Sequence, residues 1–227
     1  MPRQSYRDDL DELLLDVDEM GEAIIDQLVA GLHALQTGDE ALATLVVERD
    51  EAINETYLAL EQDCIDLIAL QQPVASDLRF ISASSKIATA LEGIGDLATN
   101  FGQYALTRTD RDEPSPPIDI DQIGEDATAM VRDAMAAYLD SDVEAAREIA
   151  ARDDDLDVLC QHASQQVTRD LLESKQNGTD QWEIEHRLDD VSRLLLTVRD
   201  LERVGDHAVN IAARTLYMVE NNPELLY

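Results

Sequence analysis

The chain has 227 residues, of which 44% are hydrophobic and only 4% aromatic, and its formal net charge is −32. A chain of this length and apolar content can bury a sizeable core. The excess of acid argues against a nucleic-acid groove and against direct adhesion to an anionic membrane, because both surfaces attract clustered Lys and Arg.

The basic residues are unusual in kind, since only two of the 17 are lysines, Lys86 and Lys175. Such an acidic, lysine-poor composition predicts a halophilic protein from a salt-rich cytoplasm. There a Debye length of about 3 Å at 1 M salt screens the repulsion between like charges. An ordinary acidic cytosolic protein is the alternative.

No segment predicts export or membrane insertion. Acidic residues occur throughout the first 25 positions, and no apolar run reaches 18 residues. We therefore expect a cytoplasmic protein without a signal peptide or a membrane-spanning helix. The two cysteines, Cys64 and Cys160, lie in apolar helical stretches of different halves, and we expect both to be buried free thiols.

Apolar residues recur at helical spacing along almost the whole chain, and no segment shows the alternation of a strand. Thr37-Gly38-Asp39 predicts a stop, a turn and a new N-cap, and Pro73 interrupts the following helix. Asn177-Gly178 predicts a corresponding turn in the second half. The pattern predicts an all-α protein of six long helices, over roughly residues 10–36, 39–72, 76–107, 120–139, 143–176 and 180–219.

One stretch between the third and fourth predicted helices has no helical period. Residues 110–117 (DRDEPSPP) are polar and rich in proline, which predicts a linker. The linker divides the chain into a first unit at residues 8–109 and a second unit at residues 118–222. We expect two tandem three-helix bundles related by a pseudo-twofold internal repeat.

An internal repeat relates the two units. Residues 91–100 (LEGIGDLATN) and 201–210 (LERVGDHAVN) agree at six of ten positions, at an offset of 110. A second match lies on the preceding helix of each unit, where the pattern of residues 49–54 returns at 152–157, at an offset of 103. Repeats of this kind indicate that each unit packs in the same way.

The repeat brings acidic side chains into pairs. Residues four apart on a helix project from one face, one turn apart. Because the second and third helices of each unit should run antiparallel, the two pairs of a unit reach nearly the same height, at about 1.5 Å per residue. The facing pairs are Asp50 and Asn54 with Glu92 and Asp96 in the first unit, and Asp153 and Asp157 with Glu202 and Asp206 in the second.

Facing carboxylates repel one another unless a cation lies between them, so each set is a candidate metal site. Oxygen ligands suit Mg²⁺, Mn²⁺ or iron better than copper. The alternative is an acidic surface neutralised by Arg49, Arg152 or Arg203, and the residues alone leave both interpretations open. Gly95 and Gly205, inside the same helices, are expected where another helix backbone approaches closely.

The chain offers little chemistry for catalysis. It has no Gly-rich phosphate loop, no H-E-x-x-H, no G-x-S-x-G and no C-x-x-C sequence. A ferritin-like di-iron bundle needs two E-x-x-H motifs, and this chain has one, at Glu183 and His186. His207 follows Asp206, but its counterpart is Leu97, so we expect His207 to face solvent. These observations predict a non-enzymatic protein, with a carboxylate-bridged metalloenzyme or a metal-binding helical scaffold as the alternative.

The run LQQPVASDLR at residues 70–79, followed by Lys86-Ile87 and LEGIGDLATN, resembles the PhoU family of phosphate-signalling proteins, as does ERDE with Ile53-Asn54. The resemblance covers nearly the whole chain and includes both units. It implies two similar three-helix bundles, often paired into homodimers. It also implies negative control of phosphate uptake and of phosphate-starvation signalling, through contact with the ATP-binding subunit of the phosphate ABC transporter and with a sensor kinase.

The resemblance further implies metal clusters held by E(D)-x-x-x-D motifs, with iron, zinc, manganese or magnesium as the metal. On this chain the motifs fall on Glu92 and Asp96, on Glu202 and Asp206, on Asp153 and Asp157, and imperfectly on Asp50 and Asn54. Asn54 departs from the pattern, as does Gly93 where Arg203 stands in the second unit. Because a neutral amide is a poorer ligand than a carboxylate, we expect the first site to be weaker or differently filled.

Overall fold

The computed structural model describes residues 2–107, 119–175 and 181–225, with side chains over 6–107, 119–172 and 188–225. Within these ranges the chain is almost entirely helical and contains no strand, so the predicted all-α class is confirmed. The helices are α1 (Pro2–Thr37), α2 (Glu40–Glu48), α3 (Asp50–Gln71), α4 (Ala75–Leu106), α5 (Ile120–Asp140), α6 (Val143–Lys175) and α7 (Gln181–Glu220).

The second predicted helix is divided at Arg49 into α2 and α3, where a single continuous helix was expected. Arg49 keeps a helical backbone, with φ −74° and ψ −16°. Its N–H still bonds to Leu45 O, and Ile53 N to Arg49 O, both at 3.2 Å. The division is therefore a bend in a continuing hydrogen-bonded chain, and Asp50 is the first residue after it.

The turns fall where the sequence predicts them. Gly38 adopts φ 66°, a left-handed conformation that ends α1, and the carboxylate of Asp39 then accepts from Ala41 N and Leu42 N to cap α2. Ser141 adopts φ 54° after α5. The predicted turn at Asn177-Gly178 and the linker at residues 110–117 lie outside the described residues, and the boundaries of the two units stay a prediction.

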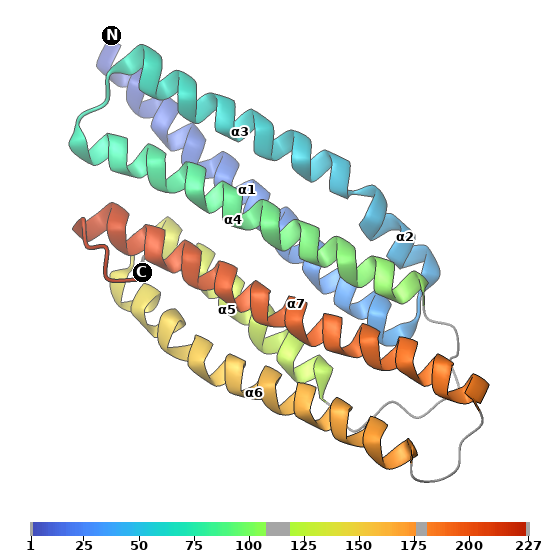
Figure 1. Cartoon of the computed structure of the whole chain (residues 1–227). Helices are drawn as coiled ribbons and strands as arrows, with labels where there is room; N and C mark the ends of the chain where they lie inside the picture. The colour runs from blue at the N-terminus through green and yellow to red at the C-terminus, as the bar shows by residue number, and fades with distance from the viewer. Residues whose placement is uncertain (1, 108–118, 176–180, 226–227) are drawn as a thin grey trace.

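The two helices that carry the repeated motif lie side by side at the centre of the molecule (Figure 1). On either side of this pair, α3 packs on α4 and α6 packs on α7, while α1 and α5 lie behind and contact each other. The two units therefore meet along two seams, α4 with α7 and α1 with α5. This arrangement sets the acidic pairs of both units on helices that are neighbours in space.

One hydrophobic core extends through both units. The leucines that open the two motifs, Leu91 and Leu201, are fully buried in it, as are Ile94 and Val204. Burying each such side chain contributes about 1.5–3 kcal/mol. Glu92 and Glu202 directly follow the buried leucines, so they lie at the edge of the core.

Close packing of α1 on α4 depends on one glycine. A Cβ added to Gly31 would lie 2.7 Å from the carbonyl oxygen of Ala98, so the two helix backbones approach here. Cys64 and Cys160 are buried free thiols, as predicted. None of the helices in the described part of the chain is long and apolar enough to cross a membrane.

Candidate functional site: two acidic clusters

The structure brings Asp50 and Asn54 of α3 together with Glu92 and Asp96 of α4, and we name these residues the first acidic cluster. Burial raises the pKa of Glu92, and the carboxylates of Asp96 and Asp50 raise it further. Burial also raises the pKa of Asp96, and Asp50 again adds to the rise. The predicted antiparallel alignment of the two pairs is therefore present, with carboxylates of α3 and α4 within electrostatic range of each other.

Two residues that the sequence analysis did not single out position Asp50. The hydroxyl of Thr99 donates to Asp50 Oδ1 at 3.0 Å, and the buried amide of Gln27 donates to Thr99 Oγ1 at 3.1 Å. Asn54 Nδ2 donates to the other oxygen, Asp50 Oδ2, at 3.3 Å. Both oxygens of Asp50 thus accept a hydrogen bond from the protein itself.

The second acidic cluster consists of Asp153 and Asp157 on α6 with Glu202 and Asp206 on α7. Burial is the main cause that raises the pKa of Asp153 to about 6, and the carboxylates of Asp157 and Asp206 add to it. The pKa values of Glu202 and Asp206 are raised by burial and then by Asp157. The second unit therefore also aligns its two acidic pairs as predicted.

The second acidic cluster differs from the first in its hydrogen bonds. Asp153 Oδ1 is buried and has no hydrogen-bond partner among the residues that the structure describes. The repeat gives the reason, because Val209 stands where the first unit has Thr99, and valine has no hydroxyl to donate. A buried carboxylate oxygen without a donor costs free energy and is open to a cation or to a proton.

Arg203 links the two clusters electrostatically. Its charge lowers the pKa of Asp96 in the first cluster and of Asp206 in the second. Its Nη1 is also 3.7 Å from Asp200 Oδ1. Arg152, the other candidate of the second unit, forms an ion pair with Asp133 at 2.6 Å. Arg203 therefore neutralises the clusters only in part, since the pKa values of Asp96 and Asp206 stay raised by burial despite its charge.

The expectation that His207 faces solvent is wrong. Its ring is half-buried, and Nδ1 is buried without a hydrogen-bond partner in the described part of the chain. A Cβ added to Gly93 would lie 2.6 Å from Cε1 of His207, so the ring fills the space beside that glycine. Burial lowers the pKa of His207, and the charge of Arg203 lowers it further.

Gly95 and Gly205 are surrounded by side chains, whereas the sequence predicted a helix backbone. A Cβ on Gly95 would lie 2.9 Å from Ile24 Cδ1. A Cβ on Gly205 would lie 2.5 Å from Leu156 Cδ2 and 2.9 Å from Asp153 Oδ1. The glycine of each motif therefore makes room for the apolar residue that lies between the two acidic-pair positions of the facing helix, Ile53 in the first unit and Leu156 in the second. Gly95 also makes room for Ile24, and Gly205 for the carboxylate oxygen of Asp153.

One further acid lies near the clusters and was missed by sequence reasoning. Asp200 is 4% exposed, and its Oδ2 accepts from Tyr104 OH at 2.8 Å and from Asn100 Nδ2 at 3.2 Å. These bonds cross from α7 to α4 and so join the two units. No sequence signal could have found this contact, because Asp200 lies just before the motif and its counterpart is Ala90.

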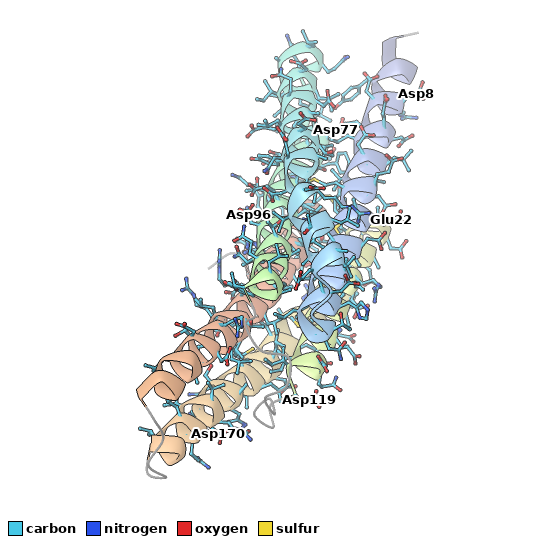
Figure 2. All side chains as sticks on the ribbon, turned by 90° about the vertical axis from the view of Figure 1, so that its right-hand side faces the viewer. Asp8, Glu22, Asp77, Asp96, Asp119 and Asp170 are labelled. Carbon is cyan, nitrogen blue, oxygen red and sulfur yellow. The ribbon has the colours of Figure 1, made fainter. Side chains whose placement is uncertain are left out.

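The acidic side chains of the clusters are only partly preorganised. Within the described residues, no three His, Cys, Asp or Glu side chains converge closely enough to hold a metal ion. Asp96, Asp157, Glu202 and Asp206 are exposed and have room to turn. Figure 2 shows Asp96 on the opposite side of the molecule from Glu22 of α1, within an acidic surface that extends over the whole length. The side chains of Glu183 and His186 lie outside the described residues.

Known proteins resemble this chain along its whole length. The model of the PhoU domain matches it twice, over residues 17–105 and 120–215. The phosphate-specific transport system accessory protein PhoU homolog 1 of Methanothermobacter thermautotrophicus is 34% identical over 96% of this chain and 95% of its own length. The PhoU homolog of Clostridium acetobutylicum is 29% identical, with 96% of each chain covered.

Solved structures agree with this similarity. The crystal structure of PhoU from Pseudomonas aeruginosa superposes with a TM-score of 0.87 at 28% identity, covering 96% of this chain and 100% of that one. The family match and the all-helical architecture thus agree with the resemblance that the sequence motifs indicated. The chain belongs to the PhoU family.

Proposed function

We propose that this protein is a non-enzymatic negative regulator of phosphate uptake and of phosphate-starvation signalling. The observation that carries the proposal is the similarity, over 96% of the chain, to a protein named as an accessory of phosphate-specific transport. The PhoU domain model also matches the chain twice, once in each unit. We infer that control of the transporter passes through direct contact, because the similar protein is named as an accessory of the transport system.

The regulator acts in the cytoplasm, as a homodimer, on the ATP-binding subunit of the phosphate ABC transporter, and for signalling on a sensor kinase. A pull-down from a lysate kept at native salt concentration tests this contact. Tagged protein from phosphate-replete cells should enrich the ATP-binding subunit several-fold over a tag-only control, as measured by quantitative mass spectrometry. Equal recovery in the two samples would contradict the proposed contact.

The second acidic cluster is proposed to hold a divalent or trivalent cation, namely iron, zinc, manganese or magnesium. The support is the buried Oδ1 of Asp153, which lacks a donor within the described chain, beside three carboxyl groups whose side chains are exposed. Asp157, Glu202 and Asp206 would turn toward Asp153 on binding. A bound cation supplies positive charge that ties α6 to α7. The first acidic cluster should bind more weakly, since both oxygens of Asp50 already accept hydrogen bonds.

A further inference from the structure

An exposed apolar stripe lies between the first acidic cluster and the turn that joins α3 to α4. We name it the α3–α4 stripe. It consists of Leu58, Ile65 and Ile68 on α3, Val74 just before α4, and Leu78 on α4. Their exposed fractions run from 41% for Ile68 to 66% for Val74, which is high for large apolar side chains. The core of the first unit therefore does not account for these residues.

Helical spacing places the α3–α4 stripe on the same face as the first acidic cluster. Ile68 follows Asn54 by 14 residues, and Leu78 precedes Glu92 by 14 residues, which is close to four full helical turns in both cases. Ile68 and Leu78 each lie five residues from Pro73, so they reach the same height on two helices that pack side by side (Figure 1). The face of the acidic cluster thus continues as an apolar surface toward the turn.

Comparison of the two units shows that the fold does not require Leu58 and Ile65 to be apolar, whereas Ile68 and Leu78 have apolar counterparts in Leu171 and Leu188, of which Leu188 is 44% exposed. At the repeat offset of 103, Leu58 and Ile65 correspond to Gln161 and Thr168, which are exposed polar residues. The second bundle forms with these polar residues in place. Exposed apolar side chains that gather on one face are typical of a contact surface for another molecule, and the packing of the repeat does not explain Leu58 and Ile65.

We propose that the α3–α4 stripe is the docking surface for an amphipathic helix of a partner protein, apolar along one side and carrying Arg or Lys at one end. This inference rests on the proposed function, because it locates the contact through which the regulator acts. The stripe is interrupted by Glu61 and ends at the carboxylates of Asp50, Glu92 and Asp96. Basic residues beside the apolar face of the partner would meet these acids.

Charge also argues against a second copy of this chain as the occupant. A twofold pairing through the stripe would bring two copies of the same acidic face together, in a protein whose net charge is already −32. From Asp50 to Ile68 the face is about 27 Å long, the length of a helix of about 18 residues. A single partner helix of ordinary length would therefore cover both the apolar and the acidic parts.

A peptide-binding experiment tests the docking surface directly. The probe is a fluorescent synthetic 18-residue helix with leucines along one side and arginines at one end. The variant I65Q/I68Q is compared with V158Q/L172Q, which replaces two α6 residues of similar exposure, 47% and 59%. Fluorescence anisotropy should give at least about tenfold weaker binding for I65Q/I68Q, and wild-type binding for V158Q/L172Q. A probe with scrambled leucines, or with glutamates for arginines, should also bind at least about tenfold more weakly.

Two results would overturn the docking surface. One is equal affinity of the wild type and I65Q/I68Q for the amphipathic probe, and the other is equal affinity of the wild type for the scrambled probe. Analytical ultracentrifugation of the same variants measures the oligomeric state and so tests whether a second copy of this chain covers the stripe. Loss of a wild-type dimer in I65Q/I68Q alone, with helicity by circular dichroism intact, would assign the stripe to a second copy.

Phosphate uptake separates failure of this inference from failure of the proposed function. In a deletion strain, restoration of uptake control by wild type and V158Q/L172Q but not by I65Q/I68Q supports the docking surface. Full restoration by I65Q/I68Q would refute the docking surface and leave the regulatory function standing. Unchanged uptake in the deletion strain itself would refute the regulatory function.

Discussion

Gly93 of α4 and His207 of α7 meet across the seam between the two units. A Cβ on Gly93 would lie 2.6 Å from Cε1 and 2.7 Å from Nε2 of the imidazole ring, so only glycine leaves the ring its present place. The equivalent position of the second unit holds Arg203, which interacts with both acidic clusters. Gly93 and His207, two residues that depart from the repeated motif, thus contact each other. This contact has no equivalent on the other side of the seam, where the corresponding residues are Arg203 and Leu97 by the repeat.

A double-mutant cycle tests this contact. Gly93→Ala should lower the free energy of unfolding, because a clash with the ring costs about 1–3 kcal/mol and outweighs the gain of about 1 kcal/mol in helix propensity. In a His207→Ala background the clash is gone, and the same substitution should raise the free energy of unfolding by about 0.5–1 kcal/mol. Urea denaturation at constant salt measures all four proteins. Additive effects would show that the two residues do not interact.

The buried Asp200 predicts that a tyrosine hydroxyl stabilises the join between the units. Tyr104→Phe removes the 2.8 Å hydrogen bond to Asp200 Oδ2 and should cost about 1.5–3 kcal/mol, the range for a bond to a charged group. Tyr57→Phe is the matched control, because its hydroxyl contacts an exposed glutamate, Glu61, at 3.4 Å. That change should stay within about 0.5 kcal/mol. Equal losses in the two variants would argue against a special role of Asp200.

The raised pKa of Asp153 predicts that the free energy of unfolding of the metal-free protein depends on pH. Its pKa is raised from 3.8 to about 6, so the folded state binds this proton more tightly than the unfolded state. The ionised carboxylate therefore destabilises the fold above about pH 6, and this cost disappears as the pH falls toward 3.8. At pH 8, Asp153→Asn should be more stable than the wild type by about 1 kcal/mol, allowing for solvent screening. The difference should vanish near pH 4.

Chemical denaturation of chelator-treated protein at several pH values checks this prediction. Asp155→Asn is the control, since its side chain is exposed and is not among the charges that raise the pKa of Asp153. If metal-free Asp153→Asn is less stable than the wild type at pH 8, the ionised carboxylate of Asp153 does not destabilise the fold, and the prediction is wrong.

The acidic clusters predict a metal content that depends on named carboxylates. Asp206→Asn should lower the metal that copurifies with the protein by about tenfold, and Asp96→Asn should have a smaller effect, while helicity stays nearly intact. Elemental analysis of protein purified without chelator gives the metal content, and circular dichroism gives the helicity. Asp155→Asn serves again as the control. Unchanged metal in the double variant Asp96→Asn/Asp206→Asn would refute both sites.

Most of the fold could be predicted because it depends on local signals. Apolar periodicity and the turn residues Gly38 and Pro73 give most helix positions to within a few residues, although α1 begins at Pro2, eight residues before the predicted start at residue 10. The repeat predicts which helices are equivalent, and antiparallel packing then aligns the acidic pairs. The bend at Arg49 has no such signal, because its backbone remains helical and its hydrogen bonds continue.

The site was less predictable because its details depend on tertiary contacts. Thr99 reaches Asp50 across 49 residues, and Asn100 reaches Asp200 across 100, so neither partner follows from spacing along one helix. The burial of His207 follows from the missing side chain of Gly93, which the sequence shows only as a departure from a motif. The repeat explains one of these details once the structure is known. Val209 stands where the first unit has Thr99, so Asp153 lacks the hydrogen-bond donor that Asp50 has, among the described residues.

Phosphate uptake in phosphate-replete cells tests the central proposal most directly. Radiolabelled phosphate uptake should be several-fold higher in a strain that lacks this gene than in its parent, and a plasmid copy of the gene should restore the parental rate. A deletion strain with the parental rate of uptake would contradict a negative regulator of phosphate transport.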